Sequence, residues 1–310
     1  MRPFAQPSLS SCAKPVVSLP GMTRVVQRAP APWVALVVVA AALGGCGRGA
    51  GQVPAPTPRV VSLVPAASAI IDALGAKAHL VGVTRYCAVT GPPVIGGMDA
   101  RPEAVLAQDP DLVVLGDYPS QAALREQLTA LGLNAVAPSF VGIDDLRAAV
   151  TRLGAALGRE AAAAALVAAL DRDLALAKER AASRRPVKVL LVYDVQQGYV
   201  YTTGGGDHLG ALLDLCGARN IAQGGPLTTR LALDAVLARG PELILHVAPG
   251  EAYPDDAAAR AYWKSLPEVP AVRAGHVYVW PDDHLAQNGP WIGAAALQLS
   301  DLLDRVAGAP

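Results

Sequence analysis

This sequence has no excess of positive or negative charge. Its 310 residues include 26 lysines and arginines and 26 aspartates and glutamates, so the formal net charge at pH 7 is zero. Proteins that bind nucleic acid usually have a basic face, and nothing in this composition indicates such a partner. The sequence also lacks a nucleophile motif, histidines at metal-ligand spacing and a dinucleotide fingerprint. These absences argue against an enzyme and against a metal site.

A hydrophobic run long enough to cross a membrane is missing as well. The apolar stretch from Trp33 to Cys46 has only about a dozen apolar residues, and a spanning helix needs about 20. It follows Arg24 and Arg28 and ends in small residues, which is typical of a secretory signal peptide. Leu43-Gly-Gly-Cys46 resembles the bacterial lipobox, which implies that Cys46 is lipidated and begins the mature chain.

The first 58 residues are therefore predicted to divide into two parts. Residues 1–45 form a signal peptide, and residues 46–58, rich in glycine, alanine and proline, form a lipidated tether. A soluble signal peptide with a cysteine near its cleavage site is the alternative. Because the residues before Met22 resemble neither a signal nor a fold, Met22 is a second candidate start. The expected location is the periplasm or the cell surface, with the lipid in the membrane.

One segment of the chain occurs twice. Residues 102–115 recur with substitutions at 233–246, and the separation of roughly 130 residues is the size of a domain rather than of a solenoid repeat. In each copy an acidic residue, Glu103 or Asp234, opens a short helix, and a proline stops it before an apolar strand. We therefore expect two similar lobes with the two carboxylates at matching places.

The rest of the chain alternates between short apolar strands and helices. In the first half the predicted strands are 60–64, 80–83, 112–115 and 135–136, and the predicted helices are 68–74, 120–131 and 143–157. This alternation predicts an α/β fold with parallel sheets covered on both faces. We expect two Rossmann-like lobes, residues 59–158 and 186–310, each with its own core.

A different segment separates the two lobes. Glu160 to Arg184 is rich in alanine and free of glycine and proline, which predicts a single helix about 37 Å long. Residues 159–185 are therefore expected to be a rigid connecting helix. The second lobe is predicted to begin with a strand at 187–193 and to end with a helix at 292–306.

Cysteine is scarce. Besides Cys12 and Cys46 the chain has only Cys87 and Cys216. These two residues fall in different lobes, where a disulfide would hinder any hinge motion. Two free thiols, buried or in a cleft, are therefore expected.

The order of these features resembles the helical-backbone class of substrate-binding proteins, which serve ABC importers for cobalamin, haem and iron siderophores. The resemblance begins at Arg59-Val-Val-Ser-Leu-Val-Pro65 and extends to Val306, and the repeated acidic segment is specific for this class. Short segments similar to those of this class also occur at residues 85–87, 96–97, 204–213 and 217–221. The resemblance implies a binding protein without enzymatic activity or an intrinsic cofactor, and its cargo is expected to be a cobalamin-like corrinoid.

The resemblance also assigns a role to the two acids. In this class one acidic residue on each lobe pairs with arginines of the two permease subunits, and the repeat puts Glu103 and Asp234 at those positions. Two separated carboxylates on a rigid body would set register and association rate on a symmetric dimer. The alternative, compatible role is stabilisation of a helix N-terminus. Asp234 is one methylene shorter than the usual glutamate.

Comparison with cobalamin binders suggests which side chains face the ligand. Tyr86 corresponds to a cleft tyrosine, Tyr201 to a cleft phenylalanine and His284 to a cleft tryptophan. Two tryptophans that clamp cobalamin correspond here to Gly97 and to about Thr228. Aromatic walls suit a flat macrocycle because they bury a large area with little loss of entropy. The predicted ligand-binding residues are Tyr86, Gly97, Tyr118, Tyr201, His284 and Trp291.

Other polar and aromatic residues have structural interpretations. The turn from Gly204 to Asp207 is predicted to lead from a strand into a helix whose first residues face the cleft. Tyr193 and Trp263 are interpreted as core or lobe-surface aromatics, and His246 as a satisfied histidine at the end of a strand.

Two alternatives remain. Haem is the first, with Tyr86 or His284 as an axial ligand, and a ferric siderophore is less well matched because only Arg85 and Arg230 are obvious cleft arginines. The second is an enzyme with a two-lobed cleft, in which Asp282-Asp283-His284 would supply an acid and a base.

Overall fold

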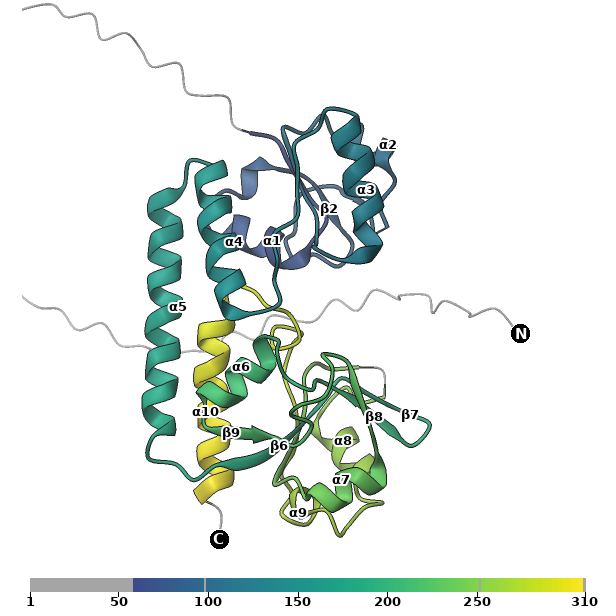
Figure 1. Cartoon of the computed structure of the whole chain (residues 1–310), viewed down its shortest axis with the longest axis vertical. Helices are drawn as coiled ribbons and strands as arrows, with labels where there is room; N and C mark the ends of the chain where they lie inside the picture. The colour runs from purple at the N-terminus through teal and green to yellow at the C-terminus, as the bar shows by residue number, and fades with distance from the viewer. Residues whose placement is uncertain (1–57, 98, 251, 309–310) are drawn as a thin grey trace, which may run out of the picture. The chain divides into compact units, whose positions relative to one another are not determined.

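The computed structural model describes residues 58–97, 99–250 and 252–308, so the predicted signal peptide, the tether and Cys46 lie outside the described residues. Figure 1 shows two α/β lobes joined by helix α5 (Glu160–Ala181). The α/β class with parallel sheets is confirmed. Within the described ranges, no helix combines the length and the apolar composition needed to cross a bilayer.

The N-terminal lobe is built on five parallel strands in the order β3-β2-β1-β4-β5. Neighbouring residues of a strand face opposite sides of the sheet, so Val60 packs with α1 and α4 while Val61 packs with α2 and α3. The strands are β1 Val60–Ser62, β2 Leu80–Thr84, β3 Val94–Gly96, β4 Leu112–Val114 and β5 Ala135–Val136. The helices are α1 Pro65–Ala73, the 3₁₀ turn η1 Lys77–His79, α2 Pro102–Leu106, α3 Pro119–Ala130 and α4 Ile143–Ala156.

The C-terminal lobe repeats this strand order. Its parallel sheet runs β12-β11-β6-β9, which matches β5-β4-β1-β2 of the first lobe. Helices α2 and α7 each precede the corresponding strand, β4 or β11, as the repeated segment predicted. The strands are β6 Val187–Val192, β9 Ala218–Asn220, β11 Leu243–His246 and β12 Val277–Val279. The helices are α6 His208–Leu215, α7 Leu233–Arg239, α8 Asp256–Trp263, α9 Pro270–Arg273 and α10 Ile292–Gly308.

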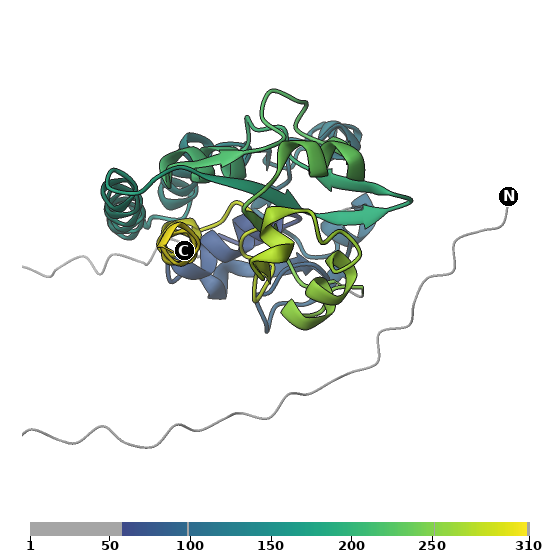
Figure 2. The same ribbon diagram turned by 90° about the horizontal axis from the view of Figure 1, so that it is seen from below.

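An antiparallel sheet in the C-terminal lobe was not predicted. It has the order β10-β8-β7 and consists of β7 Asp194–Gln196, β8 Tyr199–Thr202 and β10 Thr229–Ala232. Gln197 and Gly198 connect β7 to β8 with φ values of 51° and 80°, the conformation that suits a two-residue hairpin. The hairpin projects on the side of the lobe away from α5 and α10 (Figure 2).

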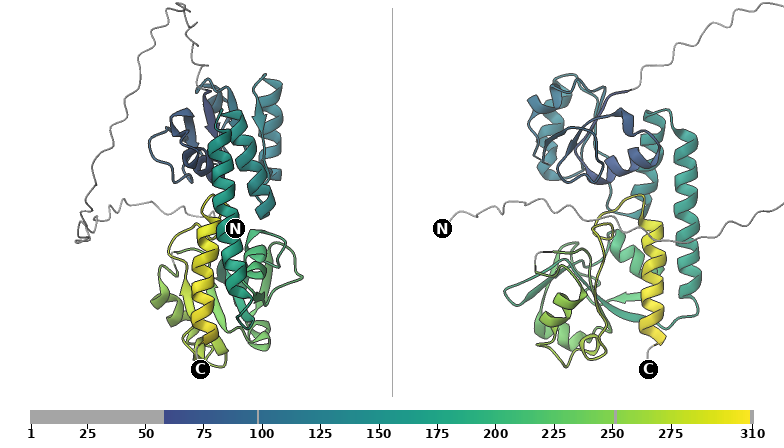
Figure 3. Two further views of the ribbon diagram at one scale, coloured as in Figure 1. Left: turned by 90° about the vertical axis from the view of Figure 1, so that its left-hand side faces the viewer. Right: turned by 180° about the vertical axis from the view of Figure 1, so that it is seen from behind.

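Helix α5 packs closely on both lobes. It lies beside α4 of the first lobe and α10 of the second (Figure 3). Glycine lets α4 and α10 come close to α5. A Cβ on Gly154 of α4 would overlap the Cβ of Ala163 in α5, and a Cβ on Gly293 of α10 would lie 2.9 Å from the Cβ of Asp173 in α5.

The hydrophobic core is continuous through α5. One buried cluster contains side chains of α1 and α4, of α6 and α10, and of α5 between them; the α5 members are Ala163, Leu170, Leu174 and Ala177. Two separate cores were expected. The structure differs because α5 buries apolar residues against both lobes, and each lobe has a further cluster only on the sheet face remote from α5.

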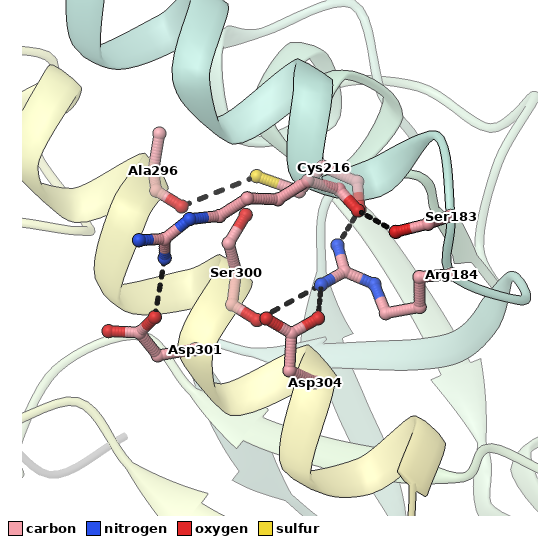
Figure 4. A network of polar contacts seen from close by, with 8 residues as sticks. Ser183, Arg184, Cys216, Ala296, Ser300, Asp301 and Asp304 are labelled. Atoms are coloured by element: carbon pink, nitrogen blue, oxygen red, sulfur yellow. Dashed lines mark hydrogen bonds and ion pairs between the residues drawn. The ribbon is translucent and has the colours of Figure 1, made fainter.

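A polar network fixes the segment that follows α5 (Figure 4). The guanidinium of Arg184 is buried, pairs with Asp304 of α10, and donates to the backbone carbonyls of Ser300, at 3.0 Å, and Cys216. A buried charge is tolerated when it is paired and hydrogen-bonded in this way. The network therefore ties the start of the second lobe to α10 and to the end of α6.

The two described cysteines are free, as predicted. Cys216 is buried, and its thiol lies 3.5 Å from the carbonyl oxygen of Ala296. Cys87 is half-buried and contacts the hydroxyls of Ser68 and Thr84 at 3.0 and 3.2 Å.

The interpretation of His246 as a satisfied histidine is confirmed, and it leads to a prediction about pH. His246 is buried and accepts a hydrogen bond from Trp263 Nε1 at 3.0 Å. Burial, opposed by the charge of Asp194, lowers the pKa of His246 from 6.5 to about 4. Between these values the unfolded chain binds a proton that the folded chain does not, so stability is complete above about pH 6.5 and falls as the pH drops toward 4, by about 3 kcal/mol.

Urea unfolding from pH 7 to pH 4 should show this loss in the wild-type chain and a shallower loss in His246→Gln, whose amide can still accept from Trp263. His284→Gln, at a histidine that is only half-buried, provides the control. An unchanged pH dependence in His246→Gln would contradict the assignment.

Candidate functional site

A cavity of about 240 Å³ lies where loops of both lobes meet. The N-terminal lobe supplies residues that follow β4 and β5, and the C-terminal lobe supplies Tyr193 after β6, the start of α6 and the loop before β10. Ligands of open parallel sheets bind beyond the carboxyl ends of the strands, and this cavity has that position. Its lining residues are Asp117, Tyr118, Ser139, Phe140, Val141, Tyr193, Asp207, His208, Leu227 and Thr228.

Two tyrosines, together with Phe140, give the cavity its aromatic surface. Tyr118, one of the predicted residues, precedes α3, and its ring lies over Gly116, where a Cβ would collide with it. The backbone N–H of Tyr193 donates to the carbonyl of Tyr201 at 2.9 Å. Burial raises the pKa of the Tyr118 hydroxyl, and burial together with the charge of Asp207 raises the pKa of Tyr193. Both hydroxyls therefore remain protonated at neutral pH.

The polar groups of the cavity are acidic or neutral. Asp207 caps α6 by accepting a hydrogen bond from the Gly210 N–H at 2.8 Å. His208 is buried, and its Nε2 lies 3.1 Å from the carbonyl oxygen of Leu285 and so donates to it. Burial lowers the pKa of His208 against the opposing effects of that hydrogen bond and of Asp207. Since none of the described lining residues is a lysine or an arginine, the carboxylates of Asp117 and Asp207 have no cationic side chain beside them in this cavity.

Hydrogen bonds between the lobes fix one wall of the cavity. The buried Asn288 side chain donates through Nδ2 to the carbonyls of Phe140 and Gly142, both at 2.8 Å. The His208 backbone N–H donates to the carbonyl of Val141, which lies between them, at 2.7 Å. Three successive carbonyls of the first lobe are thus held by the second, so this wall joins the two lobes.

The other predicted ligand-binding residues fall into three places outside this lining. His284 stacks on Trp291 with ring centroids 4.2 Å apart, and Trp291 Nε1 donates to the His284 carbonyl at 2.6 Å. Tyr86 is exposed after β2, and the Arg85 guanidinium lies 5.9 Å from its ring centroid and 3.6 Å from where a Cβ on Gly97 would be. Tyr201 lies on β8, opposite Asp194 and Arg230 in the antiparallel sheet.

The structure tests several of the roles that the sequence suggested for residues in this region. The expectation that the first residues of α6 face the cleft is met by Asp207 and His208, and Thr228 also lines the cavity. Tyr193 was interpreted as a core or lobe-surface aromatic; it is 42% exposed, as expected of a lobe-surface residue, and it also lines the cavity. Trp263 is a core residue, as interpreted. Asp117 and Leu227 were missed, because neither has a local sequence signal.

The two repeated acids occupy equivalent exposed positions. Glu103 lies in the first turn of α2 and Asp234 in the first turn of α7, and neither caps its helix through the side chain. Within the described part of the chain neither carboxylate has a hydrogen-bond or ion-pair partner. Both helices lie on the side of their lobe away from α5 (Figure 1). The two acids are therefore free to contact another molecule.

Known proteins with similar sequences are transport proteins rather than enzymes. An uncharacterised ABC transporter substrate-binding lipoprotein of Bacillus subtilis, YvrC, is 25% identical, with 83% of this chain and 91% of that protein covered. A protein of Salmonella typhi named vitamin B12-binding protein is 26% identical, with coverages of 80% and 91%.

Solved structures share the fold. The apo form of RhuT from Roseiflexus sp. RS-1, titled a periplasmic heme-binding protein, superposes with a TM-score of 0.71 at 23% identity, covering 81% of this chain and 99% of that one. Residues 60–284 match the family described as periplasmic binding protein. Members of this family deliver ligands to ABC permeases. With more than half of its length matched and two lobes joined by one helix, this chain belongs to the periplasmic binding protein family, in the helical-backbone class that serves ABC importers.

Proposed function

We propose that this protein captures a corrinoid of the cobalamin type in the cavity between its lobes and delivers it, chemically unchanged, to an ABC importer. The observation that carries this proposal is the composition of the cavity: two tyrosines and two carboxylates, with no lysine or arginine among the described lining residues. Lipidation of Cys46 would hold the protein at the membrane.

Charge favours a corrinoid over the alternatives. Haem carries two propionates and most ferric siderophores are anionic, and an anion beside Asp117 and Asp207 is repelled in a partly dehydrated site. The periphery of a corrinoid carries amides, whose N–H groups can donate to these carboxylates. Tyrosine ligation of haem iron would also require loss of the hydroxyl proton, which the raised pKa values of Tyr118 and Tyr193 oppose.

The size of the cavity limits how the ligand is held. A corrinoid is larger than 240 Å³, so only part of its ring can enter between Tyr118 and Tyr193. The remainder would rest on exposed side chains outside the cavity: Leu227 of its lining is 50% exposed, and Tyr86 of the N-terminal lobe is 55% exposed. Tyr86 thus keeps the ligand-binding role that the resemblance implied.

The named relatives support both tetrapyrrole-like ligands. The similarity to the Salmonella typhi protein supports vitamin B12, and the shared fold of the Roseiflexus protein keeps haem as the second candidate. Calorimetry of the mature chain with cyanocobalamin and with hemin tests the proposal. Binding of one cyanocobalamin per protein supports it, whereas tight hemin binding without cyanocobalamin binding contradicts it.

Loss of either cavity tyrosine should weaken ligand binding. Tyr118→Ala and Tyr193→Ala should each reduce the affinity for cyanocobalamin by about 1 to 3 kcal/mol, because each removes an aromatic contact. Tyr199→Ala is the matched control, since Tyr199 is 40% exposed, compared with 41% and 42% for Tyr118 and Tyr193, but does not line the cavity. Equal affinities of all three variants in calorimetry would show that the ligand binds elsewhere.

Neutralising the cavity acids should change the preference between ligands. In the double variant Asp117→Asn, Asp207→Asn, hemin should bind more tightly relative to cyanocobalamin by about tenfold or more, because repulsion of the propionates is removed. Asparagine also caps helices, so α6 should persist. Parallel visible-absorption titrations measure the two affinities, and an unchanged ratio would rule out the charge argument.

Reversal of the two exposed acids should impair uptake without affecting ligand binding. We propose that Glu103 and Asp234 pair with cationic side chains of the two permease subunits. Cells that carry Glu103→Arg, Asp234→Arg should take up much less radiolabelled cyanocobalamin than wild-type cells, while the purified variant binds it normally. Glu126→Arg, Glu268→Arg, which reverses two other exposed acids, is the control. Normal uptake by the first variant would contradict the docking role.

A further inference from the structure

Each proposed docking acid has an exposed leucine on the same face of its helix. Leu106 follows Glu103 by three residues in α2, and Leu237 follows Asp234 by three residues in α7, a spacing that puts the side chains side by side. The two leucines are 38% and 39% exposed. They occupy equivalent positions of the repeated segment, so both lobes present an acid and a leucine together.

Packing within the lobes leaves part of each leucine uncovered. The preceding residues, Val105 and Val236, are fully buried and attach α2 and α7 to their lobes. The leucines belong to none of the buried clusters. A single exposed leucine needs no explanation, but the same exposed leucine beside an unpaired acid in both lobes does.

We infer that Leu106 and Leu237 form the apolar half of a two-point contact with a protein partner that offers two equivalent surfaces. Each surface would place a cationic side chain against the acid and an apolar patch against the leucine. The inference rests on the proposed function, under which the partner is the pair of membrane subunits of the importer. The leucines add a contact that salt does not screen, whereas the acids act mainly on the association rate and are screened.

The test compares two double variants on the purified importer in lipid nanodiscs. ATPase stimulation by the cyanocobalamin-loaded protein is measured at about 50 and about 300 mM NaCl, across which screening strengthens. In Leu106→Ser, Leu237→Ser, the concentration for half-maximal stimulation should rise roughly fivefold per leucine at both salt concentrations, as expected for lost burial of part of each side chain. In Glu103→Gln, Asp234→Asn, the concentration for half-maximal stimulation should rise strongly at low salt and only slightly at high salt.

The control is Leu131→Ser, Leu176→Ser, which removes one leucine of 57% exposure at the end of α3 and one of 41% exposure in α5. Melting temperature and cyanocobalamin affinity are measured for every variant and should match the wild type. A leucine variant that behaves like this control, or whose defect disappears at high salt, overturns the inference alone. A wild-type protein that neither binds cyanocobalamin nor stimulates the importer overturns the proposed function and the inference with it.

Discussion

The packing of α5 against α4 and α10 is the constraint on which the rest of the structure depends. Gly154 and Gly293 let the helices approach closely, and Leu170 and Leu174 of α5 join a core that includes side chains of both lobes. A dense apolar core of this kind resists small displacements. The cavity has walls from both lobes and the exposed acids lie one on each lobe, so α5 determines the geometry of both.

The sequence contained most of this architecture because the relevant signals are local. Alternating apolar strands and helices define a parallel sheet, and the alanine-rich stretch beginning at Glu160 defines a helix. The repeat at 102–115 and 233–246 predicted two similar lobes, and the lobes do share the order of four strands. The hairpin after β6 was not predicted, because its strands are only three and four residues long and only Gln197-Gly198 marks the turn. The core shared by the two lobes and α5 was not predicted either, because it depends on which faces of α5 each lobe covers.

The candidate site was less predictable, because side-chain position depends on contacts distant in sequence. Tyr193 reaches the cavity from the end of β6, where its backbone N–H pairs with Tyr201, and that pairing exists only within the unpredicted antiparallel sheet. Asp207 resembles an ordinary helix cap, which it is, and its second role in the cavity follows from the approach of the first lobe. Glu103 and Asp234 were easier to recognise, because the repeated segment puts them at equivalent positions.

Hydrogen exchange along the chain tests most directly whether α5 belongs to one common core. Backbone amides within a cooperative core exchange only when the whole unit unfolds. The account predicts that the amides of α5 near Leu170 and Leu174 are protected as strongly as those of β1 and β6, with a free energy of opening equal to that of global unfolding. Exchange of α5 through a local opening, while the strands of both lobes remain protected, would show instead that the lobes are independent bodies joined by a loose spacer.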